Sequence, residues 1–159
     1  MGILVNMGGL VEYQEVAEYL PLEIESFTQI VVDNQTCLNE EIPNIQSVIK
    51  ASTEAKINNV RIINTPVGIS LDGVKLTGYK LIIEGETKSK IQYVADEFEE
   101  SVYSMVSKIP FISYIVMPDN FNPMCRITTS AFIEDIFVER VDSRHIYESI
   151  SILLTAEIC

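Results

Sequence analysis

The sequence has no tryptophan, only one histidine (His145), and no apolar run that approaches the length of a membrane-spanning helix. Its three cysteines, Cys37, Cys125 and Cys159, form no CxxC pair. A zinc site takes four Cys or His ligands, or three at a catalytic centre, commonly at short spacings. We therefore expect no metal site and no membrane span.

Candidate catalytic groups are equally scarce. A serine or cysteine nucleophile needs a base beside it, and no GxSxG pattern surrounds any serine here. The residues around His145 are those of a hairpin end, which favours a histidine with a local structural role. Gly8-Gly9 lacks the following GK[ST] of a phosphate-binding loop. We expect no enzyme, no catalytic residue and no bound cofactor.

Basic residues are absent from the first 49 positions, which hold eight acids, and the whole chain carries a net charge of −12. Such a charge does not favour a nucleic-acid partner. The acidic start is either a solvated polar face or an arm that docks on a basic surface of a partner or another copy. The first basic residue is Lys50, so the basic start of a signal peptide is missing, and we expect the protein to be made and kept inside a cell.

An odd number of cysteines excludes a complete set of disulfides within the chain. We expect Cys37 and Cys125 to be buried or free thiols. Cys159 is the last residue, where chains are usually exposed. A disulfide between copies through Cys37 or Cys159, formed under oxidising conditions, is the cross-link that the sequence suggests.

Sequence periodicity divides the chain into two parts. Residues 10–20 place apolar side chains near helical spacing up to Pro21, which fits a short helix or an extended arm. Residues 43–52 begin with a proline in a first-turn position and predict one or two helical turns. Beyond residue 55, segments rich in β-branched and aromatic residues alternate with turn pairs such as Asp72-Gly73. We predict a mainly β domain, an antiparallel β-sandwich or partly open barrel, with one or two short helices in the N-terminal third.

Several short motifs at characteristic spacings make the sequence similar to a known protein family. FTQIVVDNQTCLNEEIPNIQSVI (residues 27–49) is similar to the start of the SPOCS domain family (spore coat and SipL), with departures at Asn39, Ile42 and Asn44. The second half resembles the same family more specifically, over residues 80–119 and 131–158. The matching positions are Gly85, Tyr93 to Ala95, Ser101 to Tyr103, Ile109 to Phe111, Asp135 to Arg144, and Ile152 to Ala156.

The resemblance implies a non-enzymatic domain from endospore-forming bacteria, found in spore-envelope proteins. It covers residues 27–159, so we interpret residues 1–26 as an added extension that acts as an assembly arm, with Ile3, Leu4 and Val5 as its inserting apolar segment. A strand edge or this arm would add to a neighbour's sheet.

We predict a structural subunit of a spore coat, exosporium or spore-surface polymer that assembles with copies of itself and with other spore-envelope proteins. It would be made in the mother-cell cytoplasm without a signal peptide and deposited on the spore. An adaptor that binds a coat morphogenetic protein is the alternative. A small ligand-binding or enzymatic sandwich is the third reading, and it would require a pocket that no linear motif predicts.

Overall fold

The alternation of apolar and polar residues along the chain produces long β-strands. The computed structural model describes residues 2–6, 11–21 and 26–159. Its strands are β1 (Gly2–Asn6), β2 (Val11–Val16), β3 (Ser26–Cys37), β4 (Ile45–Ile69), β5 (Lys75–Ala95), β6 (Val102–Val116), β7 (Ile127–Arg140) and β8 (His145–Ile158).

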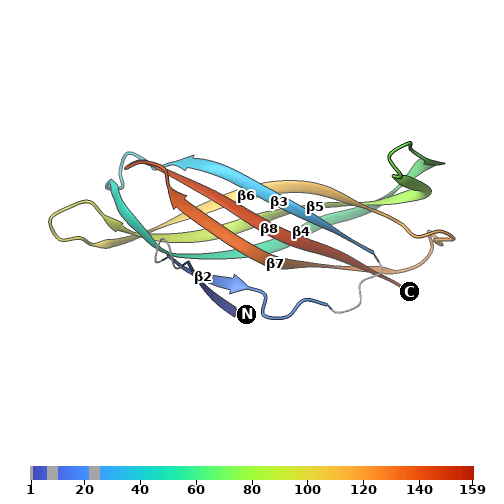
Figure 1. The fold of residues 1–159 in the computed structure, drawn as a ribbon, viewed down its shortest axis with the longest axis horizontal. Helices are drawn as coiled ribbons and strands as arrows, with labels where there is room; N and C mark the ends of the chain where they lie inside the picture. Colours follow the sequence, from blue (N-terminus) through green and yellow to red (C-terminus); the bar gives the residue numbers. More distant parts are fainter. Residues whose placement is uncertain (1, 7–10, 22–25) are drawn as a thin grey trace.

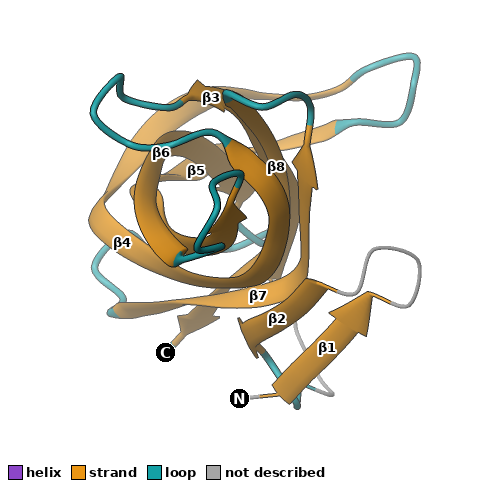
Figure 2. Ribbon diagram, turned by 90° about the vertical axis from the view of Figure 1, so that its left-hand side faces the viewer, coloured by secondary structure: helices purple, strands orange, loops and turns teal. Residues whose placement is uncertain are grey.

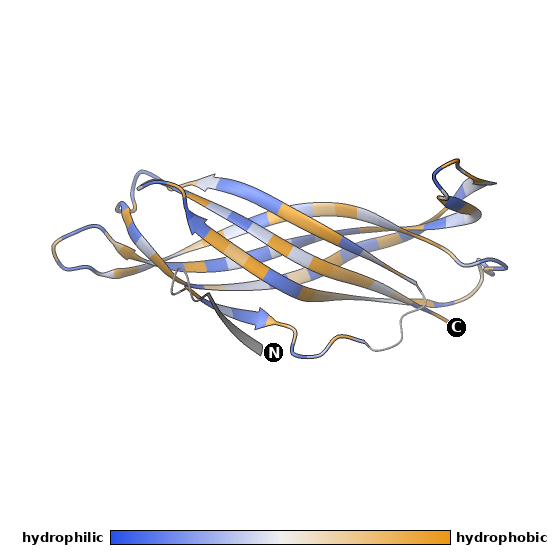
Figure 3. Cartoon of the chain, viewed as in Figure 1, coloured by the Kyte–Doolittle hydropathy of each residue, from blue (hydrophilic) through white to orange (hydrophobic). Residues whose placement is uncertain are grey.

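These strands form two sheets rather than one closed barrel. The first has the order β1-β2-β4-β5-β6 and the second β3-β8-β7, and within the described residues every pairing is antiparallel except that of β2 with β4. Hydropathy alternates along the strands (Figure 3), and one face of each sheet turns inward. The core between the sheets includes Leu81, Ile83 and Ile91 from β5 and Ile150, Ile152 and Leu154 from β8. The prediction of a mainly β sandwich is thereby confirmed.

The predicted short helices are wrong, because the part of the chain that the structure describes contains none. Of residues 10–20, Val11–Val16 form β2 instead, where Val11 and Tyr13 alternate into the core. Residues 45–52 are the first part of β4, whose buried positions Ile45, Val48 and Ala51 lie three apart. Two irregularities in the register with β5, between Ile45 and Ser47 and between Val48 and Lys50, produce this spacing. A bulged strand therefore imitates the helical period.

The connections are divided between the two ends of the long axis (Figure 1). The β3–β4 loop, the β5–β6 turn and the β7–β8 turn lie at one end, and the tip of the β4–β5 hairpin, the β6–β7 loop and Cys159 lie at the other. Viewed along that axis, β1 and β2 lie outside the rounded cross-section that the remaining strands make (Figure 2).

Candidate assembly site

The predicted inserting segment lies in an edge strand. Ile3, Leu4 and Val5 belong to β1, the outermost strand of the five-stranded sheet, and pair with residues of β2. The opposite side of β1 faces no other strand among the described residues. An edge strand presents unpaired backbone N–H and C=O groups, which form a template for a strand from another chain.

The rest of the predicted extension packs into the domain. Three residues of β2, Glu12 to Gln14, pair in parallel with β4. The buried Tyr13 hydroxyl donates a hydrogen bond to the Val138 carbonyl (3.3 Å) and accepts one from its N–H (3.0 Å). The Ala17 N–H donates to the Ile133 carbonyl at 2.9 Å. Residues 11–17 are therefore anchored to β4 and β7, and β1 is carried on that anchor.

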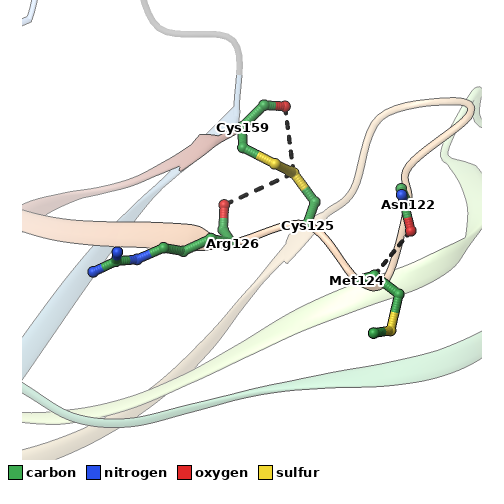
Figure 4. Close-up of a disulfide and its surroundings, with 5 residues drawn as sticks. All are labelled: Asn122, Met124, Cys125, Arg126 and Cys159. Carbon is green, nitrogen blue, oxygen red and sulfur yellow. Dashed lines mark hydrogen bonds between the residues drawn. A yellow bond between two sulfur atoms is a disulfide. The ribbon is translucent and has the colours of Figure 1, made fainter.

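The cysteines pair differently from the prediction. A disulfide joins Cys125 and Cys159, with Cα atoms 5.8 Å apart (Figure 4). The physical reason is strand register: Ile127 lies opposite Ile158, so the residues just beyond this pair meet. Cys125 is therefore not a free thiol, and Cys159 already has a partner within the chain rather than in another copy. Cys37 is free and exposed at the end of β3, and the proposed cross-link between copies is limited to it.

Motif residues of the resemblance hold the fold together. Gly85 lies directly opposite Phe111 in the β5–β6 pair. The Tyr93 hydroxyl donates to the Pro43 carbonyl at 3.0 Å. The guanidinium of Arg144 donates to three backbone carbonyls of the β3–β4 loop. These contacts fix strand packing and loop shape.

His145 lies at the start of β8, at a hairpin end as the sequence predicted. Its Nδ1 lies 2.8 Å from Oδ1 of Asp142, and the same oxygen accepts hydrogen bonds from the backbone N–H groups of Arg144 and His145. The Arg144 N–H, followed by the His145 ring, lowers the pKa of the Asp142 carboxyl below its ordinary value. The histidine and the aspartate thus shape the β7–β8 turn.

A row of polar side chains crosses the core between the sheets. Ser89 and Thr53 share a hydrogen bond of 2.9 Å, and Ser89 lies opposite Ser107 in the β5–β6 register. The Ser107 hydroxyl donates to Oε1 of Glu148 at 3.0 Å, while Oε2 has no hydrogen-bond partner among the described residues. Glu148 is 1% exposed. The sequence analysis did not identify this row. The available indication was that Glu148 lies two residues before Ile150, so that both side chains point to the same face of the strand.

Burial raises the pKa of Glu148, and the hydrogen bond from Ser107 opposes the shift. Above the ordinary pKa of glutamate, the folded state then binds more protons at this site than the unfolded state, so stability falls as pH rises toward the folded pKa. We expect the free energy of unfolding to fall in this window by up to about 1.4 kcal/mol per pH unit, and the Glu148→Gln variant to lose that component. Urea titrations between pH 4 and pH 8 measure both slopes, and equal slopes would contradict the prediction.

A concave surface lies beside the anchored segment, residues 11–17. A cavity of about 570 Å³ is lined by Glu15, Ala17, Glu18, Tyr19, Thr53, Glu54, Ala55, Ala131, Phe132 and Ile133. Within the described ranges, no group of three His, Cys, Asp or Glu side chains is placed to hold a metal ion. The same ranges contain no helix with the length and apolar character needed to cross a membrane.

Comparison with known families finds one match. The family model described as "SipL, SPOCS domain" matches residues 44–141, which include β4, β5, β6 and all of β7. No curated protein and no solved structure matches the chain.

Proposed function

The chain belongs to the SipL SPOCS-domain family, which makes it a spore-related protein, and from this premise we propose that it is a structural subunit of a bacterial endospore envelope. Its action would be self-assembly, in which copies add to one another through exposed sheet surfaces. Self-assembly requires no catalytic group. This is in keeping with motif residues that contribute to strand packing and loop shape.

The free edge of β1 is the observation that carries this proposal. Natural proteins usually protect an edge strand with charged residues or proline, yet the β1 sequence GILVN has neither. The strand is held at its place by the anchored β2, so its free edge is offered to a neighbour in a fixed position. Pairing of this edge with a strand of another copy supplies backbone hydrogen bonds without any new secondary structure.

Negative-stain electron microscopy tests the proposal on the 159-residue chain beside a variant that lacks residues 2–6. This deletion removes β1 and retains the core residues Val11 and Tyr13, so the variant should fold with an unchanged circular dichroism spectrum. We expect ordered filaments or sheets from the intact chain and a large loss of them from the variant. An intact chain that stays small and uniform at every concentration would rule out self-assembly.

An adaptor is the second candidate, and the acidic end of the molecule supports it. Glu40 and Glu41 in the β3–β4 loop and residues 96–100 of the β5–β6 turn are exposed at the same end. An adaptor would remain monomeric or dimeric and would bind a basic partner in a salt-sensitive manner.

A further inference from the structure

The outer face of the five-stranded sheet carries a cluster of lysines, although the chain is strongly acidic. Lys88 and Lys90 on β5 and Lys108 on β6 are all exposed on this face. Lys88 and Lys108 are direct cross-strand partners, and Lys90 lies opposite Val106, which is 55% exposed. We call these four residues the lysine face. It consists of three positively charged side chains and one exposed apolar side chain.

Among the described residues of a single copy, the positive charges of the lysine face are not neutralised by ion pairs. Like charges directly opposite each other on a sheet repel and destabilise the pair. Glu54 of β4 lies opposite Lys88, but in the described part of the chain no ion pair joins any of the three lysines to a carboxylate. Shallow hollows adjoin the face, one of them lined by Ser52, Glu54, Lys88 and Lys90. A ligand with several negative charges would relieve the repulsion.

The turn between β5 and β6 has the opposite character. Its sequence, Asp96 to Glu100, surrounds Phe98 with four carboxylates, and the Phe98 side chain is fully exposed. We call this segment the acidic turn, and it projects past the neighbouring loops at its end of the molecule (Figure 1). Covering the exposed ring of Phe98 with another apolar surface removes it from water, which is favourable.

Backbone hydrogen bonds give the acidic turn a fixed shape. The Ala95 N–H donates to the Ser101 carbonyl (2.9 Å), and the Glu100 N–H donates to the Glu97 carbonyl (3.0 Å). The Asp96 N–H donates to the Asn44 carbonyl at 2.8 Å, which ties the turn to the β3–β4 loop. A preformed turn loses little conformational entropy when it binds.

The two surfaces are complementary in charge, since the acidic turn has one exposed apolar side chain among four carboxylates and the lysine face has one beside three ammonium groups, with Glu54 at the β4 side of the face. We propose that the acidic turn of one copy docks on the lysine face of another, with Phe98 against Val106. This inference rests on the proposed self-assembly and names a contact for it, separate from the free edge of β1.

The contact has to join different copies. The acidic turn and the lysine face belong to the same hairpin, and five residues of extended strand, about 17 Å, separate Ala95 from Lys90, the β5 lysine nearer to the turn. The turn therefore cannot fold back onto its own lysine face. A contact between two different surfaces is heterologous, so it continues from copy to copy unless its rotation closes a ring.

Charge reversal provides the test. We expect Glu97→Lys/Glu99→Lys in the acidic turn, which cancels its net charge, and separately Lys88→Glu/Lys90→Glu in the lysine face, which makes its net charge negative, to raise the onset concentration of assembly about tenfold or more, because the attraction between the two surfaces is then lost or reversed. An equimolar mixture of the two variants should assemble again as an alternating polymer, because the unchanged acidic turn of one variant meets the unchanged lysine face of the other, and the lysines introduced in the turn meet the glutamates introduced in the face. Light scattering and electron microscopy follow both results.

A matched variant separates this contact from an effect of net charge. Glu40→Lys/Glu41→Lys changes the net charge by the same amount as the turn variant, in another exposed loop. It should assemble like the unchanged chain. If the turn variant also does so, or if the mixture fails to recover, the docking proposal is wrong, while self-assembly of the unchanged chain keeps the proposed function.

Disulfide trapping tests the contact even when no polymer forms. In a Cys37→Ser background, copies carrying Glu99→Cys are mixed with copies carrying Lys90→Cys under mild oxidation. We expect the cross-linked pair to form at least about tenfold faster than with Glu40→Cys in place of Glu99→Cys, through higher local concentration. Equal rates would overturn the proposal. They are also the result expected if the lysine face binds an anionic polymer instead of the acidic turn.

Discussion

Replacing Gly85 by alanine should lower the free energy of unfolding by about 3 kcal/mol, at the upper end of the usual range for an overpacked core. A Cβ atom at this position would lie 2.4 Å from the Lys56 carbonyl oxygen and 2.6 Å from Cζ of Phe111. Real Cβ atoms essentially never approach other atoms within 3.0 Å. Because one of the two obstacles is backbone, the β4–β5 pair has to move to make room.

Gly68 provides the matched control for this prediction. It lies in the same β4–β5 hairpin, and a Cβ added there would meet nothing within 4 Å. Gly68→Ala should therefore change stability by no more than about 0.5 kcal/mol, as surface substitutions usually do. Urea unfolding followed by circular dichroism compares the two variants, and equal stabilities would show that Gly85 is not sterically required.

A second variant separates the two obstacles at Gly85. Phe111→Leu in the Gly85→Ala background removes the ring but leaves the Lys56 carbonyl in place. We therefore expect only partial recovery relative to the two single variants, which a double-mutant cycle quantifies. Full recovery would assign the whole penalty to the Phe111 ring.

The sequence allowed the mainly β fold to be predicted, because inward and outward positions alternate along most strands. The sequence predicted a helix wrongly where the strand departs from simple alternation. In β4, bulges place the buried residues Ile45, Val48 and Ala51 three positions apart, which is close to the period of a helix. Contacts that depend on register were not predictable from local pattern. The meeting of Cys125 with Cys159 requires the register of the β7–β8 hairpin, whose open end brings together two residues 34 positions apart in the chain.

The candidate site was predicted only in part. The sequence indicated an apolar segment at Ile3 to Val5, and the structure places it on an edge strand. The acidic run at 96–100 was visible, but its exposed Phe98 and the opposing lysine face depend on the two-residue period and on the β5–β6 register. Motif residues such as Gly85 and Arg144 carry the family likeness and stabilise the fold. The surfaces proposed for assembly are separate from these motif residues, as expected when function resides in sites added to a common fold.

Replacing Arg144 by methionine should lower the free energy of unfolding by about 3 kcal/mol, allowing for partial solvent exposure of its bonds. Its Nη1 donates to the Ile42 carbonyl (2.6 Å), and its Nη2 donates to the carbonyls of Leu38 (3.2 Å) and Asn39 (2.6 Å). No other residue of the described chain reaches these three carbonyls with a side-chain hydrogen bond, apart from the Cys37 thiol at Leu38. Removal of the guanidinium therefore leaves the β3–β4 loop without its common donor.

Arg144→Lys distinguishes this forked binding from charge alone. An ammonium keeps the positive charge but lacks the planar, paired donors of guanidinium, so lysine should restore less than half of the loss. Arg126 is exposed and has no side-chain hydrogen bond in the described structure, and Arg126→Met should change stability by no more than about 0.5 kcal/mol. Full rescue by lysine would show that charge, rather than hydrogen-bond geometry, holds the loop.

The consequence of losing Arg144 should extend to assembly. The β3–β4 loop that Arg144 holds also supplies the Asn44 carbonyl, which accepts from the Asp96 N–H at the base of the acidic turn. Arg144→Met should therefore increase exchange at the loop amides of residues 38–42 and 44 and at Asp96, and weaken assembly, although Arg144 lies outside both docking surfaces. Hydrogen exchange of the intact chain and the variant measures the first effect. Increased exchange in the loop with unchanged exchange at Asp96 would show that the acidic turn keeps its shape independently of Arg144.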